Sequence, residues 1–296
     1  MNMNELPPRL NIDTAAMIVE FNASVWTARK LDRSATDELV HDKNAKAKDA
    51  ARVNKHLLAG RNELEIIQKH VTSTRTYVYE QTMPWSDNGQ RLLPASKFIA
   101  FEQSMGDRRL EFDKLVQSFM GIYPTLITAQ AMALGDMFKR ADFPSVHELP
   151  SKFAWTLGYL PVPKAGDFRI DIGDKAQKEL REKLEKLSEE RVSAAHRSLW
   201  ERLHEHLTRM ADRLQVDTVQ GEEKPRRFHD TLVTGGVEMC DLLKELNLTG
   251  DQDLENARRT LEQALLGVEP DELRKNMDAR QHVASEVKKI LDSYKF

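Results

Sequence analysis

The chain has few cysteines, aromatic residues and glycines and no long apolar run, which argues against a disulfide-rich, an all-β or a membrane-spanning protein. A single cysteine, Cys240, among 296 residues excludes a disulfide within the chain and favours a reducing compartment. Aromatic residues make up only 7% and glycines number 13, which argues against an all-β domain with many tight turns. No run approaches the roughly 18 consecutive apolar residues that a membrane span needs.

The N-terminal ten residues are polar and lack the apolar core of a secretory signal, so we expect a cytoplasmic protein that contacts no membrane. Charge is abundant but nearly balanced, with 44 basic and 47 acidic residues and a formal net charge of −3. This balance excludes a uniformly basic protein that coats DNA. A charged fraction of 31% is typical of long helices with one solvated face.

Alternation of apolar and polar residues marks the expected strands. Residues 17–26 alternate and predict a strand near 16–27, although Asp13 could instead open a helix there. Residues 153–163 are predicted to be extended and to form a hairpin with the alternating segment 167–172. The strand near 16–27 would add to this hairpin and make a small antiparallel sheet.

Apolar residues at 3–4 spacing predict several long helices. Residues 61–82 and 98–119 have this pattern and are joined by a short loop with an Asn88-Gly89 turn, which predicts an antiparallel pair. A third helix is expected to begin at Pro124 and to run to about Arg140. The longest is expected from Asp174 to about Gln215, and would span about 60 Å at 1.5 Å per residue.

The C-terminal part predicts a separate helical module. Residues 217–225 are interpreted as a linker, and helical patterns follow at 226–246, 251–266 and 270–294. We therefore predict a mainly α (α+β) protein with long antiparallel helices, a small antiparallel sheet and a C-terminal helical bundle. The expected domains are an elongated body at residues 1–220 and a helical module at 221–296.

Searches for catalytic or metal-binding patterns lead to no site. His196, His204 and His206 share one predicted helix, but their spacings of eight and two cannot place two of them on one ion. Asp167, Asp171 and Asp174 could offer oxygens to Mg²⁺ or Ca²⁺, but Arg169 separates the first two and Asp174 is expected to cap a helix.

Phosphate-binding glycine motifs and a nucleophile elbow are missing from the sequence, and Gly235-Gly236 is its one glycine pair. Cys240 lies in an apolar helical pattern and is predicted to be a buried structural thiol. We predict no catalytic, cofactor-binding or metal-binding residue and no cofactor.

The densest charge feature is the segment from Lys43 to Arg61, which has six cations against one anion, Asp49. On a helix, three of these cations would share a face and could follow a phosphate backbone. A solvated helix that pairs with acidic neighbours is the alternative. The possible nucleic-acid contacts are Lys46, Lys48, Arg52, Lys55 and Arg61.

Three phrases carry a resemblance to a known family: Ser24-Val-Trp-Thr-Ala-Arg-Lys30, Pro84-Trp85 with Arg91-Leu-Leu-Pro94, and Leu160-Pro-Val-Pro-Lys-Ala-Gly-Asp-Phe-Arg-Ile-Asp171. Over roughly residues 15–215 the chain resembles an uncharacterised protein family of bacteriophages and integrative mobile elements, often encoded near MoxR/CobS-type AAA+ ATPases. The resemblance implies a phage or mobile-element source, a host bacterial cytoplasm, and a role around DNA metabolism or host takeover. It transfers no site residue.

Three functional hypotheses follow. The first is a non-enzymatic assembly or adaptor protein, homo-oligomeric through its long helices, with a AAA+ ATPase or a host defence complex as protein partner. The second is a DNA-binding accessory protein of phage DNA metabolism that uses a basic helix at 43–61. The third is an enzyme with a dispersed site, for which the sequence offers no catalytic motif.

Overall fold

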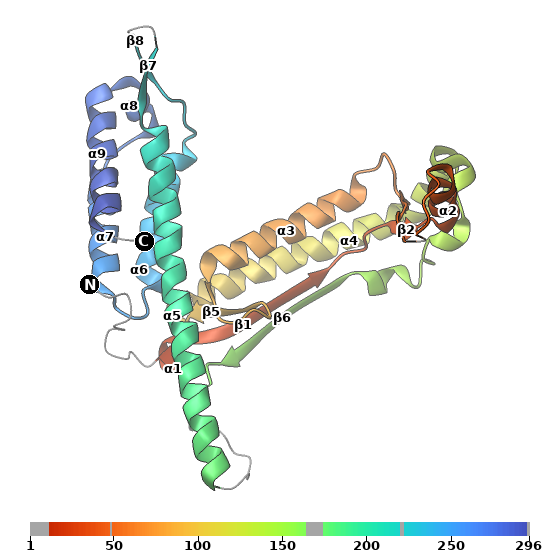
Figure 1. The fold of residues 1–296 in the computed structure, drawn as a ribbon, viewed down its shortest axis with the longest axis horizontal. Coiled ribbons are helices and arrows are strands. Elements are labelled where there is room, and N and C mark those ends of the chain that lie inside the picture. The colour runs from red at the N-terminus through yellow and green to blue at the C-terminus, as the bar shows by residue number, and fades with distance from the viewer. Residues whose placement is uncertain (1–11, 48, 164–173, 220–221, 295–296) are drawn as a thin grey trace. The chain divides into compact units, whose positions relative to one another are not determined.

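The structure, a computed structural model, describes residues 12–47, 49–163, 174–219 and 222–294 (Figure 1). It confirms the predicted class, because the described chain is mainly helical with a small antiparallel sheet and C-terminal helices. The helices are α1 (Ile12–Ala15), α2 (Arg33–Asp42), α3 (Glu63–Gln81), α4 (Phe98–Leu134), α5 (Asp174–Arg213), α6 (Thr231–Leu246), α7 (Gln252–Leu265), α8 (Pro270–Lys275) and α9 (Met277–Ser293). The strands are β1 (Ala16–Ser24), β2 (Arg29–Leu31), β3 (Asn54–His56), β4 (Met83–Pro84), β5 (Gln90–Pro94), β6 (Ala154–Pro161), β7 (Val216–Val219) and β8 (Glu222–Pro225).

The chain folds as two compact units. Unit 1 comprises residues 1–20, 79–101 and 158–296, and unit 2 comprises residues 21–78 and 102–157. This division differs from the predicted one near residue 220, because α5 shares unit 1 with the C-terminal helices α6 to α9. The apolar stripe of α5 packs against these helices.

The main sheet has the strand order β4-β5-β1-β6. The predicted strand near 16–27 is confirmed as β1, and the predicted extended segment 153–163 contains β6. Strands β1 and β5 pair antiparallel, with Ala16 opposite Pro94 and Glu20 opposite Gln90. The predicted hairpin partner, residues 167–172, lies outside the described residues.

Unit 2 is built on the predicted pair of long helices, α3 and α4, which lie side by side (Figure 1). The buried face of α3 repeats at 3–4 spacing, as expected, and includes Leu64, Ile67 and Val71. These side chains belong to the same apolar cluster as Phe112 and Phe119 of α4. Burial of such side chains contributes about 1.5–3 kcal/mol each, so this seam is a main source of stability for unit 2.

The predicted helix start at Pro124 is wrong, because α4 runs unbroken from Phe98 to Leu134. A proline inside a helix lacks the N–H that would bond the carbonyl four residues earlier, and typically costs about 3 kcal/mol. Here the buried residues on both sides of it, Phe119, Tyr123, Leu126 and Ile127, form one cluster. This continuous packing outweighs the local cost, and α4 ends at Leu134 rather than near Arg140.

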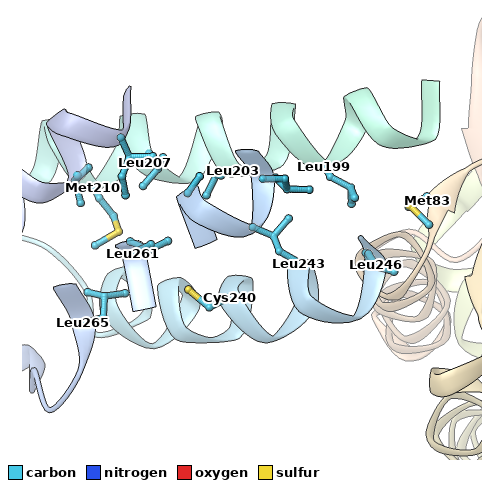
Figure 2. Close-up of a cluster of buried hydrophobic side chains, with 14 of the residues drawn as sticks. Met83, Leu199, Leu203, Leu207, Met210, Cys240, Leu243, Leu246, Leu261 and Leu265 are labelled. Carbon is cyan, nitrogen blue, oxygen red and sulfur yellow. The ribbon is translucent and has the colours of Figure 1, made fainter. Parts of the chain in front are cut away.

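Unit 1 is held together by an apolar core between α5, α6, α7 and α9. Figure 2 shows Leu203 and Leu207 of α5 facing Cys240 and Leu243 of α6, with Leu261 of α7 beside them. All of these side chains are at most 2% exposed. The predicted stripe of the longest helix is therefore confirmed over its C-terminal half.

Gly236 explains how α5 and α6 approach so closely. A Cβ at this position would lie 2.6 Å from Leu265 Cδ1 and 3.2 Å from His206 Nε2, both closer than ordinary van der Waals contact. The glycine pair that matches no phosphate motif therefore serves helix packing.

Two predictions about the C-terminal part are wrong. The predicted linker at 217–225 falls in an antiparallel hairpin of β7 and β8, with Val216 opposite Pro225. The predicted single helix at 270–294 is divided into α8 and α9 at Asn276, whose side-chain oxygen accepts a hydrogen bond from the Ala279 N–H at 3.1 Å. An asparagine at this position starts a new helix because it satisfies an N–H that has no helical partner.

Candidate functional sites

The basic segment at 43–61 does not form the predicted helix. Helix α2 ends at Asp42, turns follow, and β3 then pairs antiparallel with β2, placing Lys55 opposite Lys30. Asn44 adopts a positive φ of 51°, which is incompatible with a continuing α-helix. The proposed common face of cations is therefore wrong.

Lys55 is the residue whose environment differs most from the prediction. It is 4% exposed, and its Nζ lies 2.5 Å from Asp142 Oδ2 and 3.5 Å from Asp32 Oδ2. It also donates a hydrogen bond to the Met137 carbonyl at 2.9 Å. The hydrogen bond to Asp142 raises the pKa of Lys55, and the Ala35 N–H together with Lys55 lowers the pKa of Asp32. Lys55 is thus a buried, neutralised charge that holds unit 2 together, and it is not available to a phosphate.

The other predicted contacts have a different environment. Lys46, Arg52 and Arg61 are exposed, and no ion pair is given for them within the described ranges. Lys48 lies outside the described residues. Nucleic-acid binding by this segment stays a prediction, now with three described, exposed cations in place of five.

The histidines of α5 are spread over separate contacts. His206 is 6% exposed, and burial lowers its pKa because the charged imidazolium is disfavoured there. His206 Nε2 has no hydrogen-bond partner among the residues described, and His196 Nε2 lies 2.8 Å from a carboxylate oxygen, Asp251 Oδ2. Within the described ranges, no group of three His, Cys, Asp or Glu side chains is arranged to hold a metal ion. Asp174 begins α5, and Asp167 and Asp171 lie outside those ranges.

Cys240 is confirmed as a buried thiol, at 2% exposed. Burial raises its pKa to about 12, so the reactive thiolate is scarce at neutral pH. Its Sγ lies 3.7 Å from the Arg258 carbonyl oxygen. These properties describe a packing residue between α6 and α7.

Unit 1 contains a cavity rich in arginine that the sequence alone does not predict. A hollow of about 430 Å³ in unit 1 is lined by six residues, four of them arginines: Pro225, Arg226, Arg227, Phe228, Arg274 and Arg280. The available signal was the basic run Lys224-Pro-Arg-Arg-Phe-His229. Its first two residues were assigned to a linker, and Arg274 and Arg280 join the cavity from about fifty residues further on.

The outer face of α4 is the second surface of interest. Residues 115–135 contain no Asp, Glu, Lys, Arg or His, in a chain with 31% charged residues. The exposed positions of this stretch include Gln117, Gly121, Thr125, Thr128 and Met132, which follow helical spacing. The Met132 side chain is 90% exposed and the neighbouring Ile122 is 39% exposed. We call these six residues the α4 outer face.

Within the described ranges, no helix combines the length and the apolar character needed to cross a membrane. The chain matches no protein-family model, no curated protein and no solved structure.

Proposed function

We propose that this protein is a non-enzymatic assembly or adaptor protein, and that it self-associates through the α4 outer face. The observation that carries the proposal is an exposed helix face with no charge over residues 115–135. Surface helices normally place charged residues toward water, as the N-terminal half of α5 does. An exposed face without them favours a protein contact.

The chemistry of this face favours a second copy of the chain as its occupant. In a two-fold contact a residue near the axis meets its own copy, so a charge there would meet the same charge, and an uncharged face avoids that repulsion. Gly121, Thr125 and Thr128 are small and allow two helices to approach closely, while Met132 offers a flexible apolar side chain to bury. The self-associated protein would then present its other surfaces to a protein partner, such as a AAA+ ATPase or a host defence complex.

Size-exclusion chromatography with light scattering tests this proposal on the full chain. We expect a dimer or larger species at micromolar concentration, and a monomer after Thr125→Lys or Met132→Lys, because each buries an unpaired charge in the contact. Ile66→Lys is the matched control, since Ile66 is a 49% exposed apolar residue of α3 and should not alter the mass. A wild-type protein that stays monomeric would contradict the proposal.

A second candidate function is nucleic-acid binding through residues 43–61. It is favoured by the exposure of Lys46, Arg52 and Arg61 without ion pairs in the described structure. It predicts that affinity for DNA falls steeply with salt and that the triple change of these residues to Glu abolishes binding. The third hypothesis, an enzyme with a dispersed site, stays a prediction with no residue assigned to it.

A further inference from the structure

We propose that the arginine cavity of unit 1 binds a phosphate group. Four of the six residues that line it are arginines, and no lining residue is acidic. The planar guanidinium group offers two parallel N–H donors to two phosphate oxygens, which makes arginine the side chain most suited to such ligands. The volume of about 430 Å³ lies within the range of pockets that bind small molecules and leaves room for a phosphate group.

Arg280 gives the cavity a fixed positive charge. It is 2% exposed and donates hydrogen bonds to five backbone carbonyls, those of Arg213, Leu214, Gln215, Arg226 and Leu273, at 2.6–3.4 Å. Carbonyls satisfy its N–H groups without cancelling its charge, and within the described chain no carboxylate pairs with it. Burial lowers the pKa of Arg280, as expected for a cation without an acidic partner. A bound anion would supply the missing negative charge.

Arg226 and Arg274 are held in place by acids outside the lining. Arg226 pairs with Asp212 and Asp217, and Arg274 pairs with Asp230 and Asp271. These four carboxylates are 48–72% exposed, so water and salt screen them. Phe228 supports the arrangement, because the guanidinium carbons of Arg274 and Arg280 lie 5.0 and 5.3 Å from its ring centre. The arginines thus line the hollow, whereas none of the four acids that pair with them is a lining residue.

Arg227 is the lining cation that is free to bind. It is exposed, and the described part of the chain gives it no ion pair and no side-chain hydrogen bond. Within the described residues, none of its five N–H donors is used by another group of the protein. Because its side chain forms no ion pair or hydrogen bond within the described residues, its replacement is expected to separate ligand binding from folding.

Isothermal titration of the full chain at low salt tests the site with two probes, inorganic pyrophosphate and a short single-stranded oligothymidylate. We expect Arg227→Gln to weaken binding at least tenfold and Arg227→Lys to weaken it less, since lysine keeps the charge but loses the two-donor geometry. Arg259→Gln is the matched control, because Arg259 is an exposed arginine of α7 that does not line the cavity.

The two probes identify the source of the phosphate. Binding of both, or of pyrophosphate alone, supports a site for free phosphorylated small molecules; binding of the oligothymidylate alone supports a nucleic-acid backbone. In each case the loss must follow Arg227 and spare Arg259. No binding of either probe, or binding that Arg227→Gln leaves unchanged, overturns the proposal.

Discussion

Two segments of this chain are rich in cations, residues 43–61 in unit 2 and residues 224–229 in unit 1, and the buried cation associated with each has a different environment. In the first, Lys55 is buried between two carboxylates that cancel its charge. In the second, Arg226 and Arg227 line a hollow together with the buried Arg280, whose hydrogen-bond partners among the described residues are backbone carbonyls. A cation neutralised by acids stabilises the fold, whereas a cation satisfied by carbonyls keeps a charge that can attract a ligand.

The comparison shows why a count of charges along a sequence misleads. The first segment has more cations, but one of them, Lys55, is buried and paired with two carboxylates, so it cannot bind a ligand. The second is shorter, and its lining is completed by Arg274 and Arg280 from a different part of unit 1. Which acids are near, and on which side they lie, decides whether a basic segment is a binding surface.

The largest effect is expected for Arg280→Met. It leaves several buried carbonyls without a donor at the C-terminal end of α5, and we expect a loss of about 3 kcal/mol or more of unfolding free energy. Hydrogen exchange should accelerate at the end of α5 and in α9 while unit 2 is unaffected. Arg280→Lys keeps the charge with fewer donors and should lose less. A loss below about 1 kcal/mol would contradict the structural part of the comparison.

Lys55→Met is expected to cost somewhat less, about 2 kcal/mol, because the carboxylates it abandons are 9% and 15% exposed and can recover some hydration. The loss should appear as faster hydrogen exchange in unit 2 alone. Adding Asp142→Asn should restore part of the stability, since it removes one of the unpaired acids. If Lys55→Met left the unfolding free energy unchanged, the ion pairs of Lys55 would not stabilise unit 2, and the contrast with Arg280 would fail.

Mild acid should destabilise unit 1 before it destabilises unit 2. Burial lowers the pKa of His206 in unit 1 below its ordinary 6.5, so the unfolded chain binds the proton more readily and unit 1 loses stability as the pH falls below 6.5. The pKa of Asp32 in unit 2 is also lowered, from 3.8, so the Lys55 pair persists until much more acidic conditions. Urea unfolding on both sides of pH 6.5 measures this, with His206→Asn as the control that removes the first step. Equal weakening of both units would contradict it.

The smallest stability effects are expected for Arg52→Gln and Arg227→Gln. Both arginines are exposed without ion pairs in the described structure, so each change should alter the unfolding free energy by no more than about 0.5 kcal/mol. Thermal unfolding checks both variants side by side. A clear destabilisation by Arg227→Gln alone would mean that this side chain is structural.

The sequence predicts what local pattern controls. The 3–4 spacing of Leu64, Ile67 and Val71 predicts the buried face of α3, because the helical repeat alone determines which side chains share a side. The alternation at 17–26 likewise predicts β1. Cys240 was predicted to be buried from its apolar helical surroundings, and it is.

What remained out of reach depends on distant residues. The burial of Lys55 requires Asp142, far along the chain, and so no local signal distinguishes it from Arg52. Pro124 obeys the rule for helix starts, but packing on both sides of it carries α4 through. The cavity is missed for the same reason, since Arg280 reaches it only after the chain has folded.

The most direct test of the central claim is a paired titration of Arg52→Gln and Arg227→Gln with inorganic pyrophosphate and the oligothymidylate at low salt. The two variants remove one exposed arginine each, one from either basic segment. We predict that Arg52→Gln binds like the wild type and that Arg227→Gln loses at least tenfold in affinity. Loss on Arg52→Gln with retention on Arg227→Gln would contradict the account, because it would place the anion-binding surface at residues 43–61.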